Sequence, residues 1–243
     1  MFRRRGFFAA LTIVAAGASL GLTSSAEAAP HQAASAVPVG TIAVSTSGHA
    51  CLTRSSAPTA NVECGASLVQ KWLRSRGQAS VVRHTVLVPA GTVGGWPSST
   101  TGGVCGFSGL AVRPTGMHHC DGITFVDPIS DRDLIRTRLA AFTMLAHESA
   151  HGVQERRGKD PVAAYLVRDR SAMLPMEQQA DCWAGAALNW AIRQNHFDAG
   201  QLPAARAFFR SIGHPGSGHG SGAAREAQLL QGYAGGAKAC GLA

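Results

Sequence analysis

The residues His147-Glu148-Ser149-Ala150-His151 form an H-E-x-x-H pattern near the middle of a chain of 243 residues. On an α-helix, positions i and i+4 lie on the same face, so the two imidazole rings can converge on one metal ion. Glu148 lies beside them, where its carboxylate can take a proton from a water that the metal activates. The pattern therefore predicts a helix that carries two metal ligands and a general base.

A second acidic pattern, Glu177-Gln178-Gln179-Ala180-Asp181, follows downstream on a predicted helix. Taken alone, an E-x-x-x-D segment is typical of a solvated helix with scattered charges. A catalytic zinc site, however, normally takes three protein ligands and leaves the fourth position to water. Glu177 is therefore the candidate third ligand. Asp181, one turn further along the same face, can accept the distal N–H of a ligand histidine.

The N-terminal residues have the layout of an export signal. Three arginines in residues 1–5 precede an apolar run over residues 7–22 and an A-x-A sequence at residues 26–28. This order predicts a signal peptide over residues 1–28, and the apolar run is short for a membrane span. Arg4-Arg5-Gly6-Phe7-Phe8 also resembles a twin-arginine signal. The alternative is an uncleaved anchor, whereas cleavage predicts a secreted or extracytoplasmic protein with no stable membrane span.

The composition of the chain limits the classes of partner that we expect. The formal net charge is +8, but no run of Lys and Arg with interleaved aromatic residues occurs, and the chain has only two Tyr. Nucleic-acid recognition is therefore not expected, and the basic charge favours association with an anionic cell surface. After removal of the leader, the chain is long enough for one domain with a sizeable core.

The chain contains six cysteines, all outside the predicted signal peptide. An even number of cysteines in an exported chain suggests that all are paired, with many connectivities possible. Short loop closure favours Cys51–Cys64 and Cys105–Cys120, which leaves Cys182–Cys240 to hold the C-terminal tail. A cysteine zinc site is not expected, because no C-x-x-C spacing occurs.

Periodicity and turn residues predict a single, mainly helical α+β domain over residues 49–243, preceded by a flexible lead-in at residues 29–48. The predicted helices cover residues 51–76, the segment from Asp131 or Asp133 through His151, and residues 175–192, 203–212 and 221–233. The predicted strands cover residues 81–88 and 122–128, and a glycine-rich loop covers residues 91–109. We expect the second strand to lie at the edge of a small sheet next to the zinc helix, where extended substrate can pair with it.

Four segments within residues 105–235 form a combined pattern. They are residues 146–154 (AHESAHGVQ), residues 177–185 (EQQADCWAG), His219-Gly220-Ser221 with Arg225, and Cys120 with the strand that ends at Asp127. In this combination the chain resembles a bacterial family of neutral zinc metallopeptidases with a thermolysin-like, zincin architecture. Two positions depart from the family pattern: Gly152 replaces a frequent third histidine, and Leu229-Leu230 stand where aromatic residues are common.

The resemblance implies one catalytic zinc ion per chain, held by residues that match the family motifs. His147, His151 and Glu177 would be the ligands, Glu148 the general base, and Asp181 the partner of a ligand histidine. These are the same roles that the residue chemistry suggests, so the two lines of argument point to one site.

Three further residues are candidates for the cleft around the zinc site. The resemblance implies that His219 and Arg225 polarise the substrate carbonyl or hold the cleft, and His219 is favoured because a transition-state oxyanion needs a donor beyond the zinc. Tyr165 is a weaker candidate, since packing explains it more simply. Four other histidines are expected to be structural. They are His118, His119, His196 and His214.

Together these patterns predict an exported zinc metallopeptidase that acts on peptide or protein substrates. One alternative is a zinc hydrolase of cell-wall peptides, which suits a basic exported protein. Another is a non-catalytic cell-surface binding protein that retains a structural metal. Glu148 argues against the binding protein, because a purely structural metal site needs no base.

Overall fold

The computed structural model describes residues 42–52, 55, 57–88 and 117–242, which all belong to a unit spanning residues 34–243. These residues form seven α-helices and a small four-stranded mixed sheet, which confirms the predicted mainly helical α+β class. The α-helices are α1 (His49–Leu52), α2 (Pro58–Ser75), α3 (Arg138–Arg156), α4 (Pro161–Leu166), α5 (Arg170–Arg193), α6 (Leu202–Ser211) and α7 (Gly222–Ala239). The strands are β1 (Ile42–Ala43), β2 (His84–Leu87), β3 (His118–Cys120) and β4 (Ile123–Val126), and a 3-10 turn, η1, covers Ala199–Gln201.

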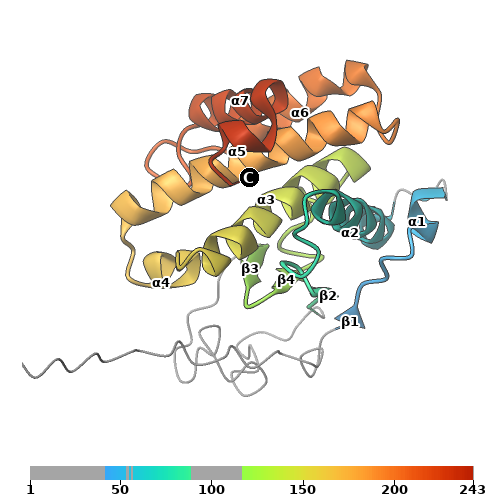
Figure 1. Cartoon of the computed structure of the whole chain (residues 1–243), viewed down its shortest axis with the longest axis horizontal. Helices are drawn as coiled ribbons and strands as arrows, with labels where there is room; N and C mark the ends of the chain where they lie inside the picture. The colour runs from blue at the N-terminus through green and yellow to red at the C-terminus, as the bar shows by residue number, and fades with distance from the viewer. Residues whose placement is uncertain (1–41, 53–54, 56, 89–116, 243) are drawn as a thin grey trace, which may run out of the picture. The chain divides into compact units, whose positions relative to one another are not determined.

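Helix α3 lies between the group formed by α5, α6 and α7 and the sheet. It packs against α5 and α6 on one side and against β3 and β4 on the other, and Figure 1 shows α5, α6 and α7 lying together. Every residue from 139 to 154 of α3 is buried, so the H-E-x-x-H motif lies in the core. The predicted signal peptide (residues 1–28) and the predicted glycine-rich loop (residues 91–109) lie outside the described residues.

The sheet has the order β1-β2-β4-β3, with β2 and β4 parallel and both outer pairs antiparallel. All four residues of β4 are buried, as expected for an inner strand. The prediction that the strand at residues 122–128 lies at the sheet edge was therefore wrong, because β3 pairs with its outer side. The edge strand that borders the motif helix is β3, which packs against α3.

The single helix predicted over residues 51–76 is two helices in the structure, α1 and α2. The break falls before Pro58, which stands in the first turn of α2, where its missing N–H costs no hydrogen bond. The predicted disulfide Cys51–Cys64 joins the two helices and is confirmed. Upstream, Ile42 and Ala43 lie within the predicted lead-in but pair with β2 as strand β1.

Helix α3 begins later than predicted, at Arg138, with Thr137 as its N-cap. The Thr137 hydroxyl accepts a hydrogen bond from Ala140 N at 3.1 Å. The prediction that Asp131 or Asp133 caps this helix was wrong, because Asp131 is used in the turn after β4. Its Oδ2 accepts a hydrogen bond from Asp127 N at 2.7 Å.

Helix α5 begins at Arg170, well before Pro175, so the predicted start near Pro175 was wrong. Asp169 caps the helix by accepting hydrogen bonds from Ser171 N and Ala172 N at 3.0 and 3.1 Å. This cap offsets part of the cost of the proline, which lies inside the helix. The earlier start places the acidic pattern in the middle of a long helix.

Helices α5 and α7 approach each other closely because both carry glycine at the contact. A Cβ atom on Gly185 would lie 1.9 Å from Leu229 O, and one on Gly232 would lie 1.7 Å from Cys182 O. The predicted disulfide Cys182–Cys240 is confirmed and joins α5 to the end of α7. The predicted N-cap of α7 is also confirmed, since the Ser221 hydroxyl accepts a hydrogen bond from Ala224 N at 3.2 Å.

Cys120 is also disulfide-bonded, and its predicted partner, Cys105, lies outside the described residues. No cysteine in the described part of the chain is free. The two disulfides above suggest an oxidising, extracytoplasmic environment. Among the described helices, none combines the length and the apolar composition needed to cross a bilayer.

Candidate metal centre

Helix α3 presents His147 and His151 on one face, and α5 brings Glu177 to them. All three side chains are buried, and one potential ligand atom from each lies within 4.8 Å of the other two. His147 Nε2 lies 3.1 Å from Glu177 Oε2, and His151 Nε2 lies 3.5 Å from Glu177 Oε1. The fold thus assembles these three residues into a group that could hold a metal ion.

The distances between the ligand atoms of this group, and the hydrogen bonding of its carboxylate, fit a bound cation. Ligand atoms about 2.0–2.2 Å from a tetrahedral zinc ion lie roughly 3.3–3.6 Å from one another, close to the two separations observed. Glu177 Oε2 is buried and makes no well-aligned hydrogen bond with a described residue, although the His147 and His219 rings lie near it, whereas buried carboxylate oxygens normally make one. A bound cation would satisfy this oxygen, so the donor set fits a metal.

Asp181 and Arg225 hold the His147 ring in the orientation that metal binding needs. His147 Nδ1 lies 2.8 Å from Asp181 Oδ1. Because an ionised carboxylate can only accept, Nδ1 carries the proton and Nε2 is directed to Glu177. Arg225 donates to the same carboxylate from Nε, at 2.9 Å, and from Nη2, at 2.7 Å. All these side chains are buried, so α3, α5 and α7 meet in one charged network.

Gln154 plays the corresponding part for His151. His151 Nδ1 lies 2.8 Å from Gln154 Oε1, and an amide oxygen can only accept, so Nδ1 donates. The Gln154 amide nitrogen donates in turn to Met176 O at 2.9 Å and to Gln179 Oε1 at 3.0 Å. The sequence interpretation missed Gln154, although its spacing of three residues from His151 places both on one helix face.

Gly152 allows α3 to approach the sheet directly behind the two histidines. A Cβ atom at this position would lie 2.5 Å from Val81 Cγ1 and 2.6 Å from His119 Nε2. His119 is buried on β3, with its Nδ1 3.0 Å from Thr124 Oγ1. The departure from the family pattern at Gly152 therefore has a packing reason in this chain.

Glu148 lies next to the metal-ligand candidates, and its side chain is buried. Burial raises the pKa of Glu148 to about 8, although the neighbouring His147 opposes the shift. No hydrogen bond joins its side chain to another described residue, so the carboxylate is available to a water molecule. Ser149 has a structural role, because its hydroxyl accepts a hydrogen bond from Trp183 Nε1 at 3.1 Å.

Without a metal, the group is held together by an ion pair between His147 and Glu177. Burial alone lowers the pKa of His147, but the Asp181 and Glu177 carboxylates outweigh it and raise the pKa to about 10. Burial favours the neutral form of Glu177, yet His151 and His147 hold the pKa of its carboxyl well below the usual range. A metal that binds Nε2 of His147 must therefore displace a proton.

The three remaining site candidates lie at different distances from this group. His219 Nε2 lies 3.5 Å from Glu177 Oε2, and its side chain is 43% exposed, so it marks the side of the group that faces solvent. Arg225 directs its Nε and Nη2 donors to Asp181, which makes it a support of His147. Tyr165 is exposed on α4, and no contact with the metal-ligand candidates is found for it among the described residues.

The other histidines have packing partners or lie elsewhere. The His118 ring stacks on Phe125 with ring centroids 5.1 Å apart, and the His196 ring lies 5.7 Å from that of Trp190. His214 lines a pocket between the segment before α3 and the end of α6.

Comparisons with protein-family models, with curated proteins and with solved structures give no match. The assignment of the site therefore depends on its geometry alone. It is a buried His147–His151–Glu177 group, consistent with a zincin-like site built from an H-E-x-x-H motif and a downstream glutamate.

Proposed function

We propose that the chain is an exported, zinc-dependent peptidase. The observation that carries the proposal is the convergence of His147, His151 and Glu177 next to an unengaged glutamate, Glu148. Two imidazoles and one carboxylate are a common ligand set of catalytic zinc, and three protein ligands leave a position open for chemistry. A structural site normally has four protein ligands and no need for a base.

Zinc, when bound, supplies a Lewis acid that polarises a carbonyl and lowers the pKa of a water. Glu148 is placed to accept the proton of the attacking water. When the C–N bond breaks, Glu148 returns this proton to the leaving amine. Peptide-bond hydrolysis needs both transfers, so one residue accounts for the proton balance.

Other residues of the site orient the ligand histidines or stabilise the charge that develops on the substrate. Asp181 and Gln154 fix the two histidine rings through their Nδ1 atoms, which leaves both Nε2 atoms for the metal. His219 stands on the exposed side of the group, where its imidazole can donate a hydrogen bond to the oxyanion that develops on the substrate carbonyl.

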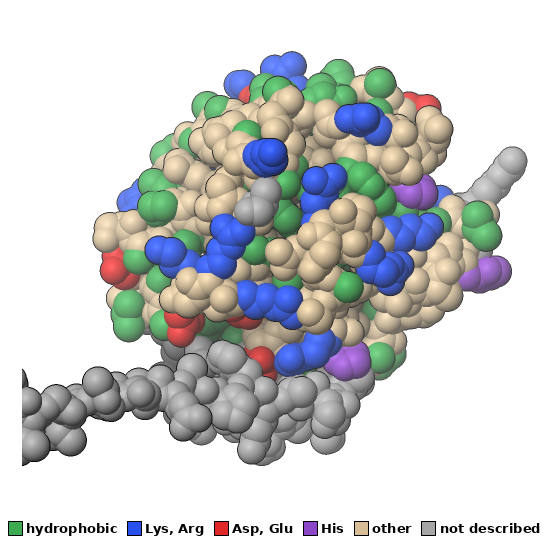
Figure 2. All heavy atoms as spheres, in the orientation of Figure 1, with side chains coloured by type: hydrophobic (Ala, Val, Ile, Leu, Met, Phe, Trp, Pro, Cys, Tyr) green, Lys and Arg blue, Asp and Glu red, His purple; other side chains and the backbone are tan. Residues whose placement is uncertain are grey.

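The proposed location is outside the cytoplasm. The signal-like residues 1–28, the cysteine pairs and the basic charge all favour it. Figure 2 shows many Lys and Arg side chains, and few Asp and Glu, over the face turned to the viewer. This distribution supports association with an anionic cell surface, and cell-wall peptides are then a natural class of substrate.

The test is metal analysis of the purified mature chain together with cleavage of a broad peptide library. We expect about one zinc ion per chain and cleavage that a chelator stops and added zinc restores. A chain that binds zinc but cleaves nothing in the library would favour the non-catalytic binding protein over the peptidase.

A further inference from the structure

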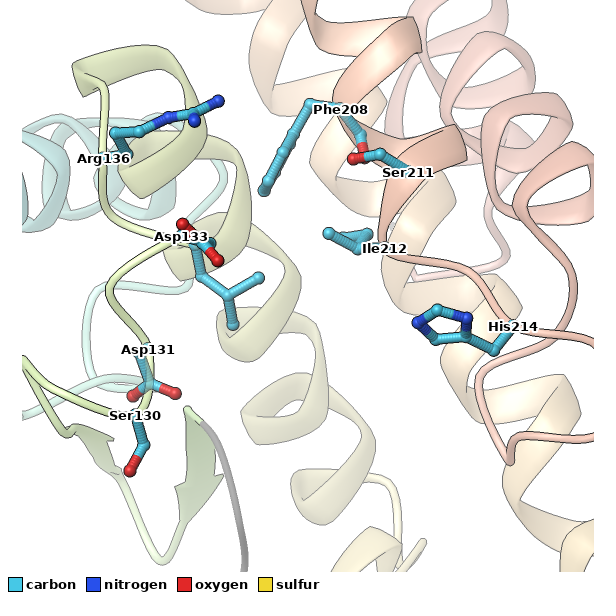
Figure 3. A pocket seen from close by; sticks show the side chains of 9 residues that line it. Ser130, Asp131, Asp133, Arg136, Phe208, Ser211, Ile212 and His214 are labelled. Atoms are coloured by element: carbon cyan, nitrogen blue, oxygen red, sulfur yellow. The ribbon is translucent and has the colours of Figure 1, made fainter.

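A pocket of about 610 Å³ lies at the N-terminal end of α3, the helix that carries the H-E-x-x-H motif. One wall comes from the segment between β4 and α3, and the other comes from the end of α6 and the residues that follow it. Figure 3 shows the two walls facing each other, with Arg136 extending toward Phe208. This volume is within the range of pockets that bind small ligands or single substrate residues.

The pocket contains two side chains of opposite charge that form no ion pair with another described residue. Asp133 and Arg136 line the same wall and both are exposed. Neither side chain makes an ion pair or a hydrogen bond with another described residue. The remaining lining includes three apolar residues, Leu134, Phe208 and Ile212. An unpaired carboxylate, an unpaired guanidinium and three apolar side chains thus share one cavity.

Along the chain, both walls of the pocket continue into segments that carry residues of the candidate site. The first wall continues into α3, which carries His147 and Glu148, and the second continues through His214 toward His219. The pocket also includes Asp131, which lies in the turn between β4 and α3. A substrate that extends from the pocket along α3 would therefore run toward Glu148.

We propose that this pocket is a subsite for a substrate residue that carries both an ammonium and a carboxylate group. The ammonium would pair with Asp133, the carboxylate with Arg136, and the aliphatic stem would pack on Phe208 and Ile212. The proposal rests on the peptidase function proposed above and names the class of its substrate. Two sources supply this chemistry: a chain-terminal lysine, and a diamino-dicarboxylic side chain such as that of diaminopimelate.

A substrate residue with only one of the two charges should bind the pocket less tightly. Its charged group would pair with either Asp133 or Arg136, and the other protein charge would be covered without a partner. Two complementary pairs also fix the direction in which the stem lies, which a single pair does not. The pocket should therefore discriminate against residues with a single charge.

Binding can be measured separately from catalysis in the zinc-loaded mature chain with Glu148→Gln, where cleavage is suppressed. Titration calorimetry would compare Nα-acetyl-lysine, its amide, and Nα-acetyl-norleucine, which carry both charges, the ammonium alone and the carboxylate alone. We expect the first to bind at least about tenfold more tightly than either of the others. Two peptides are then compared by their affinity, one with an internal diaminopimelate residue and one that ends in lysine. The peptide that binds more tightly shows which source of the two charges the pocket accepts.

Variants of the pocket make the test specific. Asp133→Asn should reduce the affinity for Nα-acetyl-lysine to that for the norleucine probe, and Arg136→Gln should reduce it to that for the amide. Asp198→Asn and Arg193→Gln, which change exposed charges outside the pocket, should leave all affinities unchanged. Equal affinity for the three probes, or insensitivity to both pocket variants, would overturn the inference.

The result also separates this inference from the proposed function. A wild-type chain that cleaves peptides without any preference at this pocket retains the peptidase function and loses the subsite. A chain that binds the doubly charged probe selectively but cleaves no peptide retains the subsite and loses the peptidase function.

Discussion

Arg225 holds Asp181 through two hydrogen bonds, from Nε to Oδ2 at 2.9 Å and from Nη2 to Oδ1 at 2.7 Å, with both side chains almost completely buried. This geometry pairs a fork of donors with a carboxylate, which is the strongest arrangement of such a pair. Because Asp181 also receives the His147 ring, the arginine on α7 supports a candidate metal ligand on α3 through a residue on α5.

Replacing Arg225 should therefore destabilise the fold strongly. Arg225→Met leaves the Asp181 carboxylate buried with too few partners, and we expect the free energy of unfolding to fall by about 3–5 kcal/mol. Chemical denaturation of the zinc-free chain measures this change. Arg206→Met, which removes one exposed partner of Glu226, is the control and should have a much smaller effect. Equal effects of the two variants would show that the buried pair is not critical.

Zinc content should depend on each of the two histidines of the motif. The mature chain should bind about one zinc ion, and His147→Ala and His151→Ala should each lose most of it, because two ligands seldom hold zinc. His196→Ala, an exposed histidine on another part of the chain, should retain the metal. Elemental analysis after gel filtration gives the readout, and full zinc occupancy in both motif variants would contradict the ligand assignment.

Glu148→Gln should separate metal binding from catalysis. Glutamine keeps the shape of the side chain but cannot accept the proton, so zinc content should stay the same while peptide cleavage falls by at least about a hundredfold. The ratio kcat/KM for one library peptide is the measurement, with the partly exposed Glu63→Gln as a matched control. Undiminished cleavage by Glu148→Gln would refute the proposed role of this residue.

Zinc binding at pH 7 should release about one proton from the protein. The pKa of His147, raised from 6.5 to about 10 in the metal-free chain, means that its ring is protonated at pH 7, and zinc requires it neutral. The same shift stabilises the metal-free fold fully below about pH 6.5, and this contribution is lost as the pH rises through about 10.

Calorimetric titration in buffers of different ionisation enthalpy counts the protons that zinc displaces. Asp181→Asn removes the main cause of the raised pKa, so zinc should then displace less of a proton, and its affinity should fall about 10- to 100-fold. A binding enthalpy that does not vary with the buffer in the wild type would show that His147 is already neutral.

Gly152→Ala should destabilise the chain even though alanine favours helix formation. Its Cβ would collide with Val81 and His119, and overpacking of this kind costs about 1–3 kcal/mol, against about 1 kcal/mol gained in helix propensity. Thermal unfolding should therefore shift to a lower Tm. Gly200→Ala is the control, because nothing lies within 4 Å of the added atom. A higher Tm for Gly152→Ala would show that the strand moves aside at little cost.

The parts of the site that were predictable from sequence are those that local spacing or coordination chemistry determines. His147 and His151 share a helix face by periodicity alone, and the need for a third ligand singled out Glu177. Tertiary approach determines the rest. Thr137 and Asp131 are both competent caps, and only the turn with Asp127 decides between them. Similarly, nothing local shows that Asp133 and Arg136 face Phe208 across a cavity.

The bond between Cys182 and Cys240 joins the C-terminal tail to the helix that carries Glu177 and Asp181. Cys182 directly follows Asp181, so this covalent tie between α5 and the C-terminal tail begins one residue from the carboxylate that orients His147. In a reducing compartment the tie is open, and α7 is held to α5 by packing and by the hydrogen bonds between Arg225 and Asp181. Oxidation after export would close this disulfide. The candidate metal centre would then be most rigid in the compartment where the proposed hydrolase acts.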